Sequence, residues 1–105
     1  MTANDAGTRV DAGRTVHKVN ETIRVSFSGM QAKNKDWIGI YREGSSNDWD
    51  NIVAWAWTND QVEGSLNFDG LGPDNYEVRA FFNNSFNVEA TAFFIIEVDH
   101  NPPLF

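Results

Sequence analysis

The sequence predicts an all-β domain, an antiparallel β-sandwich of about seven strands around one hydrophobic core. The 105 residues are enough for one domain of ordinary size and too few for two. Apolar residues recur with a period of two, as in strands that have one solvent-facing side, and no long segment carries a helical stripe. Turn-forming residues separate the apolar runs at the short spacing typical of antiparallel sandwiches.

The clearest strand is expected over 22–28, where Ile23, Val25 and Phe27 alternate with polar residues and should point inward. Further strands are expected over 15–19, 37–42, 52–58, 64–68, 76–82 and 87–98. Residues 1–14 are small and polar, which predicts a flexible tail, a linker or a loose edge strand. Residues 100–105 contain adjacent prolines, which predict a C-terminal linker after a sandwich over 15–99.

The segment that leads into the strand over 76–82 sharpens the fold class. It is a turn, Leu71 to Asn75, followed by Tyr76 as the first inward residue of the strand. In immunoglobulin-like sandwiches a tyrosine at this place, the tyrosine corner, bonds its hydroxyl group to backbone a few residues upstream. We therefore expect an immunoglobulin-like sandwich in which Tyr76 and Val78 are buried.

Composition excludes several classes of function. The chain has no cysteine, so disulfides, thiolate metal sites and cysteine nucleophiles are ruled out. Eight scattered basic residues against fifteen acidic ones give a net charge of −7, without the basic stripe that nucleic-acid binding requires. No apolar run is long enough to predict a transmembrane segment. The absence of cysteine does not fix the compartment, but it favours a prokaryotic source, because small secreted animal domains usually carry disulfides.

Two stretches carry a resemblance to known domains. The sequence KDWIGIYREG over 35–44, followed by VAWAW over 53–57, resembles the D-W-I-G signature of SKICH domains. Those are immunoglobulin-like sandwiches found in certain inositol phosphatases and autophagy adaptors. The pattern over 64–84 is similar to accessory modules of extracellular bacterial phosphoesterases, polysaccharide-degrading enzymes and adhesive proteins. The resemblance covers about 19–98 and implies a non-catalytic module joined to other domains of a parent chain. The bacterial relatives imply an extracellular or cell-surface location, and the SKICH domains imply a cytoplasmic location as the alternative.

Catalytic and metal-binding patterns are sparse. His17 and His100 lie in the terminal segments, and the chain has no G-x-S-x-G, H-E-x-x-H or phosphate-cradling glycine loop, so no enzyme activity is expected. No cofactor is expected either. Asp48 and Asp50, at alternate positions of a polar loop, are the one candidate pair of calcium ligands. The loop lacks the full spacing of a calcium-binding loop, and a solvated turn is the favoured interpretation.

Tryptophans give the strongest indication of binding. Trp49 lies in a polar loop, where core packing does not account for it, so we expect an exposed ligand contact. Trp55 and Trp57 alternate with Ala54 and Ala56, which makes both strand faces apolar. Two arrangements are possible. In one, both tryptophans point outward and form a platform for a sugar ring or for an apolar side chain of a partner. In the other, one is the core tryptophan of the sandwich and a loop half covers the other. The core arrangement is favoured, because tryptophan in this fold is commonly buried.

Two further segments complete the candidate site. Asp36 precedes Trp37 at a strand start, and the pair has two interpretations. One is a ligand contact; the favoured one is structural, with the Asp36 carboxylate as an acceptor for turn amides. Phe81 points away from the face of Tyr76, and Asn83 and Asn84 in the following turn are candidate polar partners of a ligand. The predicted ligand-binding residues are Trp49, Trp55, Phe81, Asn83 and Asn84.

The function expected from these observations is an accessory module that recognises carbohydrate or protein through exposed aromatic side chains. One alternative is a structural spacer inside a multidomain protein. The other is a SKICH-like intracellular recruitment domain that binds a protein partner or a membrane.

Overall fold

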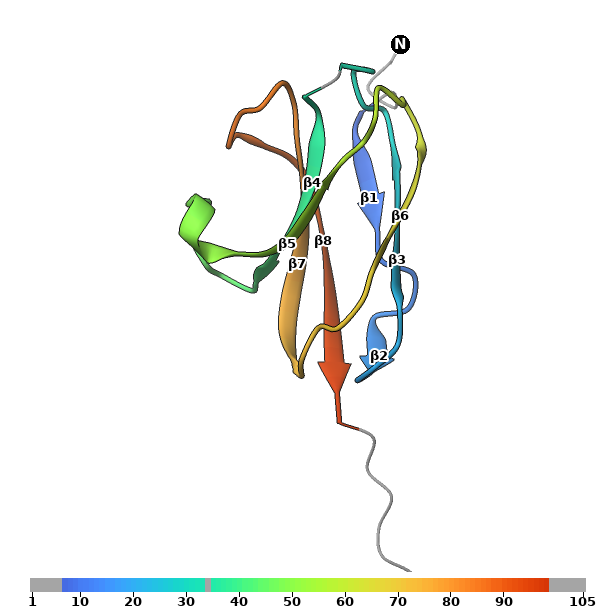
Figure 1. Ribbon diagram of the computed structural model, residues 1–105, viewed down its shortest axis with the longest axis vertical. Helices are drawn as coiled ribbons and strands as arrows, with labels where there is room; N and C mark the ends of the chain where they lie inside the picture. The colour runs from blue at the N-terminus through green and yellow to red at the C-terminus, as the bar shows by residue number, and fades with distance from the viewer. Residues whose placement is uncertain (1–6, 34, 99–105) are drawn as a thin grey trace, which may run out of the picture.

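The computed structural model describes residues 7–33 and 35–98, in which eight strands form two sheets packed face to face (Figure 1). The strands are β1 (Arg9–Asp11), β2 (Val16–Lys18), β3 (Ile23–Ser28), β4 (Trp37–Arg42), β5 (Ile52–Trp57), β6 (Gly64–Phe68), β7 (Asp74–Phe81) and β8 (Val88–Glu97). One short 3₁₀ helix, η2 (Trp49–Asn51), lies between β4 and β5. Within this described part, no helix has the length and apolar character needed to cross a membrane.

The order of the strands is that of an immunoglobulin-like sandwich. One sheet has the order β1-β3-β6 and the other the order β2-β8-β7-β4-β5. Strands β3 and β6 occupy the places of strands B and E, while β4, β7 and β8 occupy those of C, F and G. The predicted fold class is confirmed, with eight described strands and one parallel pairing, between β2 and β8.

The main core lies between the two sheets and follows the predicted alternation. Ile23, Val25 and Phe27 of β3 point inward and are buried, as are Tyr76 and Val78 of β7. The Tyr76 hydroxyl group donates a hydrogen bond of 2.7 Å to the backbone oxygen of Gly72, which is the tyrosine corner expected from the sequence. The remaining buried members of this core include Met30, Ile38, Ile40, Phe68, Leu71, Ala80, Phe94 and Ile96.

The sandwich begins earlier than the predicted boundary at residue 15. Within the segment predicted to be a tail, a linker or a loose edge strand, Arg9–Asp11 is an edge strand that pairs with β3, and Val10 lies opposite Phe27. Ala12, one residue later, is buried in the main core. The alternation over three residues is too short to separate an edge strand from a loop in the sequence. Residues 1–6 and the predicted linker over 100–105 lie outside the described residues.

Strand β5 turns its small residues toward the core and its tryptophans away from it. Ala54 and Ala56 pack against the main core, whereas Trp57 packs against a second aromatic cluster on the outer face of the five-stranded sheet. Trp55 shares that outer face by alternation and is 39% exposed. The expectation of a core tryptophan in β5 is therefore wrong.

The pairing of β5 with β4 explains this orientation. Ala54 and Ala56 lie opposite Ile40 and Ile38, whose side chains already fill the core. Trp55 lies opposite Gly39, on the outer face that also carries the Trp37 and Tyr41 rings packed over Gly39. A register shift between Ile40 and Tyr41 lies at the start of the β5 pairing.

Candidate functional site

The outer face of the five-stranded sheet carries its own apolar layer. Trp37, Tyr41 and Phe81 are buried there, although no second sheet covers them, and Ile52 and Trp57 pack against them. The Trp37 and Phe81 rings are stacked, with centroids 4.1 Å apart and an interplanar angle of 19°. A Cβ atom at Gly39 would lie only 2.9 Å from the Trp37 ring and 3.1 Å from the Tyr41 ring. The rings therefore lie directly on the backbone of β4 because this position has no side chain.

Above this layer lies a hollow of about 460 Å³, here called the tryptophan cleft. All four tryptophans of the chain line it, together with one amide and one phenylalanine: Trp37, Trp49, Trp55, Trp57, Asn84 and Phe86. Helix η2 and the β7–β8 loop, which supply Trp49 and Phe86, project from the same side of the five-stranded sheet (Figure 1). The volume falls in the range of small-molecule sites, about 300–1,000 Å³.

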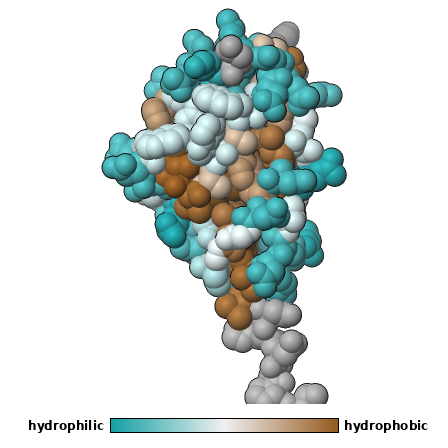
Figure 2. All heavy atoms as spheres, viewed as in Figure 1, coloured by the Kyte–Doolittle hydropathy of each residue, from teal (hydrophilic) through white to brown (hydrophobic). Residues whose placement is uncertain are grey.

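The cleft exposes large aromatic side chains to solvent. The exposed fractions are 55% for Trp49, 39% for Trp55 and 42% for Phe86. Trp49 contacts Trp37 and Trp55 in edge-on geometry, with centroids 6.4 and 5.6 Å away. Figure 2 shows one face of the molecule, where a brown apolar area is bordered by pale side chains of intermediate hydropathy, the class to which tryptophan belongs on this scale, and by hydrophilic ones.

The loop that carries Trp49 is fixed by Arg79 of β7, which is itself buried. The Arg79 guanidinium group donates to the Ser45 backbone oxygen at 2.8 Å and also to the side chain of Asn47. Its Nε atom pairs with Glu77 at 3.0 Å, and the other Glu77 oxygen accepts from the Gly44 N–H at 2.8 Å. Burial acts to raise the pKa of Glu77, but the hydrogen bonds from Arg79 and Gly44 outweigh it, so the pKa lies below the ordinary value.

The opposite wall, the β7–β8 loop, is fixed by Asp36. This fully buried carboxylate accepts from the backbone N–H groups of Gln31 and Lys33, as predicted for turn amides, and also from that of Asn83. The Trp37 indole N–H donates to the Ser85 backbone oxygen at 3.2 Å. Because both walls are held by hydrogen bonds to the sheet, the cleft is preformed and does not require a ligand to order it.

Charges around the cleft are unevenly distributed. Asp48 and Asp50 flank Trp49 on both sides in the chain and are exposed. The Lys35 ammonium group lies 5.8 Å from the centroid of the Trp57 ring. The Arg79 guanidinium lies 4.2 Å from the Tyr41 ring, and burial raises the pKa of Tyr41. The aromatic layer thus already contacts two cationic side chains through ring faces.

Three of the five predicted ligand-binding residues line the cleft: Trp49, Trp55 and Asn84. The expectation for Phe81 is wrong, because its ring is completely buried beneath Trp37 and supports the cleft from below. Asn83 is exposed but lies outside the lining, and its backbone N–H serves Asp36.

Three lining residues, Trp37, Trp57 and Phe86, are absent from the ligand-binding residues predicted from the sequence, although Trp57 is part of the outward platform that the sequence offers as one alternative. Trp37 opens a strand, which favours a structural role, and it is indeed only 2% exposed. Its remaining exposed edge still contributes to the cleft. The signal that could have found these residues is the number of tryptophans, four in 105 residues.

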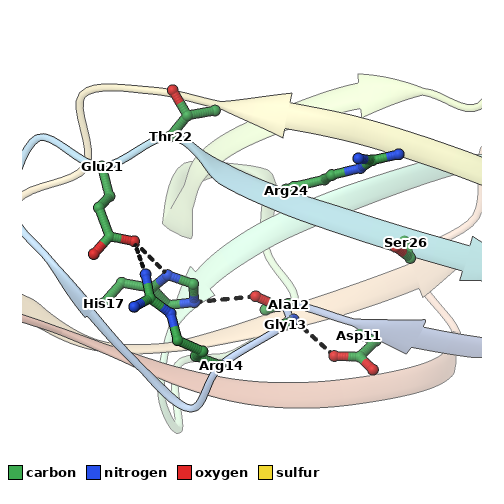
Figure 3. Close-up of a pocket in the computed structure, with 9 residues that line it drawn as sticks. All are labelled: Asp11, Ala12, Gly13, Arg14, His17, Glu21, Thr22, Arg24 and Ser26. Carbon is green, nitrogen blue, oxygen red and sulfur yellow. Dashed lines mark hydrogen bonds and ion pairs between the residues drawn. The ribbon is translucent and has the colours of Figure 1, made fainter.

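A second hollow, of about 470 Å³, lies near the start of the chain, and several of its lining residues, His17, Glu21 and Arg14 among them, already pair with each other (Figure 3). The buried His17 ring contacts Glu21 through Nδ1 and the Ala12 backbone oxygen through Nε2, both at 3.0 Å. Glu21 also accepts from the Lys18 N–H and pairs with Arg14. The Lys18 N–H and then His17 lower the pKa of Glu21 to about 2. These contacts fix the chain around β2, and both ring nitrogens of His17 are engaged.

The candidate calcium ligands gain no support from the geometry. Asp48 accepts a hydrogen bond of 2.9 Å from the Ser46 hydroxyl group, as in an ordinary polar turn. Among residues 7–33 and 35–98, no group of three or more histidine or carboxylate side chains is placed to hold a metal ion.

Comparisons with known proteins give no family. No family model matches the chain, and no curated protein matches it, so the resemblance to SKICH domains and to the accessory modules is not supported by either comparison. Among solved structures, the sulfur carrier protein SoxY from Chlorobium limicola f. thiosulfatophilum is similar, with 14% identity and a TM-score of 0.44 over 90% of this chain and 80% of SoxY. A superoxide reductase (neelaredoxin) from Ignicoccus hospitalis has 13% identity and a TM-score of 0.48 over 89% of this chain and 80% of its own. Neither likeness carries a conclusion about what this chain does.

Proposed function

We propose that this chain is a non-catalytic binding module that recognises carbohydrate or protein in the tryptophan cleft. The observation that supports the proposal is the exposure of Trp49, Trp55 and Phe86 around one preformed hollow. Exposed aromatic side chains of this size are costly to leave in water, and interfaces concentrate their binding energy in such anchors. A domain that serves only as a spacer has no need to gather every tryptophan at one solvent-facing site.

The rigidity of the cleft also favours recognition. Trp49 is supported by a loop that Arg79 ties to the sheet, and Phe86 belongs to a loop that Asp36 ties to the start of β4. A ligand therefore orders few side chains on binding, which lowers the entropic cost of association. We place the module in a larger extracellular or cell-surface protein, where an appended recognition domain holds a neighbouring domain near its target.

The test is an array of glycans and extended peptides, probed with the wild-type chain and with Trp49→Ala. We expect the variant to fold, at a cost of about 1–2 kcal/mol from two lost aromatic contacts, and to lose at least about tenfold in affinity. Phe93→Ala is the matched control, since Phe93 is 58% exposed but does not line the cleft, and its binding should equal that of the wild type.

Two results would contradict the proposal. If the wild type selects no glycan or peptide, the spacer function replaces it. If Trp49→Ala and Phe93→Ala bind the selected ligand equally well, the ligand is held elsewhere on the sandwich.

A further inference from the structure

The chemistry of the cleft wall restricts the group that can enter it. Of the six lining residues, only Asn84 has a side chain with a strong hydrogen-bond acceptor, because an indole ring offers one N–H donor and a phenyl ring offers none. The Trp37 donor is already bonded to the Ser85 backbone oxygen, so the lining offers the three other indole N–H donors and the Asn84 amide, with the amide oxygen as its one strong acceptor. A group with many hydroxyls would leave most of its O–H donors without an acceptor against such a wall, at a cost for each one. The wall therefore suits a group without hydrogen-bond donors.

The orientation of the rings points to a compact group instead of a flat one. The interplanar angles are 63° for Trp37–Trp49, 85° for Trp37–Trp55, 61° for Trp49–Trp55 and 84° for Trp55–Trp57. A flat sugar ring stacks best on one ring or on rings that share a plane. Rings that stand at steep angles to each other instead present faces and edges from several directions to a rounded group.

The electrostatics of the cleft favour a positive charge. Aromatic faces are the negative part of the ring quadrupole and attract cations, most strongly in tryptophan. Asp48 and Asp50 lie on either side of Trp49, and the whole chain has a net charge of −7. Lys35 over Trp57 is the one basic side chain seen against a lining ring in the described part of the chain, and it leaves Trp49, Trp55 and Phe86 without a cation.

Resting on one part of the proposed function, that the tryptophan cleft is the binding site, we infer that the group bound there is a quaternary ammonium cation, such as a trimethylammonium group. Such a group is rounded, carries a positive charge and has no hydrogen-bond donor or acceptor, which matches the wall, the ring angles and the charge. It can reach the cleft either as a free small molecule or on a methylated lysine side chain of a protein partner.

Choline and 3,3-dimethylbutan-1-ol are the decisive pair of probes, because the alcohol has the same shape with a neutral carbon in place of nitrogen. Binding is followed by tryptophan fluorescence and by calorimetry. We expect choline to bind at least about fivefold tighter than the alcohol, the factor that one cation–π contact supplies. Asp48→Asn combined with Asp50→Asn should weaken choline at low salt and leave the alcohol unchanged. Lys35→Gln should tighten choline, since it removes a like charge.

A peptide with trimethyllysine tests the source of the cation, and the same peptide with unmodified lysine is its control and should bind more weakly. If the methylated peptide binds more tightly than choline, the source is a protein partner. If choline binds more tightly, the source is a free ammonium ligand.

The inference and the proposed function fail in different ways. Equal affinity for choline and the alcohol would overturn the cation inference while the cleft stays a binding site. Selection of a glycan that requires Trp49, with no binding of any ammonium probe, would also overturn it and would support the proposed function. Absence of binding to every ammonium probe, glycan and peptide would overturn both.

Discussion

Replacement of Gly39 by alanine tests whether the cleft depends on close contact between aromatic rings and the backbone of β4. The new Cβ atom would lie 2.9 Å from Cζ3 of Trp37 and 3.1 Å from Cε1 of Tyr41. The first distance is roughly 0.6–1.1 Å short of the optimum for two carbon atoms. Trp37 cannot move away freely, because its other face is stacked on the buried Phe81 ring at 4.1 Å.

Overpacking of this kind costs about 1–3 kcal/mol, and the lower chain entropy of unfolded alanine returns about 0.4–1 kcal/mol. We therefore expect Gly39→Ala to lose about 1–2 kcal/mol of unfolding free energy and to change the near-ultraviolet circular dichroism of the tryptophans. Urea denaturation measures the first effect. Gly72→Ala is the matched control, since a Cβ there meets no atom within 4 Å, and it should be as stable as the wild type or slightly more stable. A Gly39→Ala protein with the wild-type urea midpoint and an unchanged spectrum would refute this account of the cleft floor.

Three further predictions concern the groups that hold the sandwich and the cleft walls. Asp36→Ala removes the acceptor of three backbone N–H groups and should cost about 2–4 kcal/mol in urea denaturation, with Asp36→Asn less affected; equal stability of Asp36→Ala and wild type would contradict this. Tyr76→Phe should lose about 1 kcal/mol of unfolding free energy, because it loses the hydrogen bond to Gly72. Tyr41→Phe should lose none, because the buried Tyr41 hydroxyl has no partner among the described residues. A larger loss for Tyr41→Phe than for Tyr76→Phe would refute this prediction. Glu21 has a pKa lowered to about 2, so its contribution to stability is complete above its ordinary pKa of 4.5 and is lost as the pH falls from there toward 2. Urea midpoints of Glu21→Gln should fall less over this interval than those of the wild type, and an identical fall would show that other groups cause the acid sensitivity.

The sandwich was predictable because its main core follows local rules. Ile23, Val25 and Phe27 alternate with polar residues, so only one side of β3 can be buried. Tyr76 follows a turn at the distance that lets its hydroxyl reach back to the backbone of Gly72. Each of these features depends on a few neighbouring residues, and each is visible in the sequence.

The outer aromatic layer was not predictable from the sequence alone, because it depends on pairing between distant strands. Both faces of β5 are apolar, and its register with β4, which sets Ala54 and Ala56 opposite the core residues Ile40 and Ile38, decides which face turns outward. Phe81 is buried by stacking on Trp37, which lies 44 positions earlier in the chain. Phe86 joins the cleft because Asp36 and Trp37 bind the backbone of its loop.

The most direct test of the tryptophan cleft follows the four indole N–H signals of the ¹⁵N-labelled chain during titration with the ligand that the arrays or the ammonium probes select. All four tryptophans line the cleft, so these signals report on this one site. We expect saturable shifts of the Trp49 and Trp55 signals, with the backbone amides of β1, β3 and β6 unchanged. Saturable shifts of amides in β1, β3 and β6, with no change in any indole signal, would contradict it.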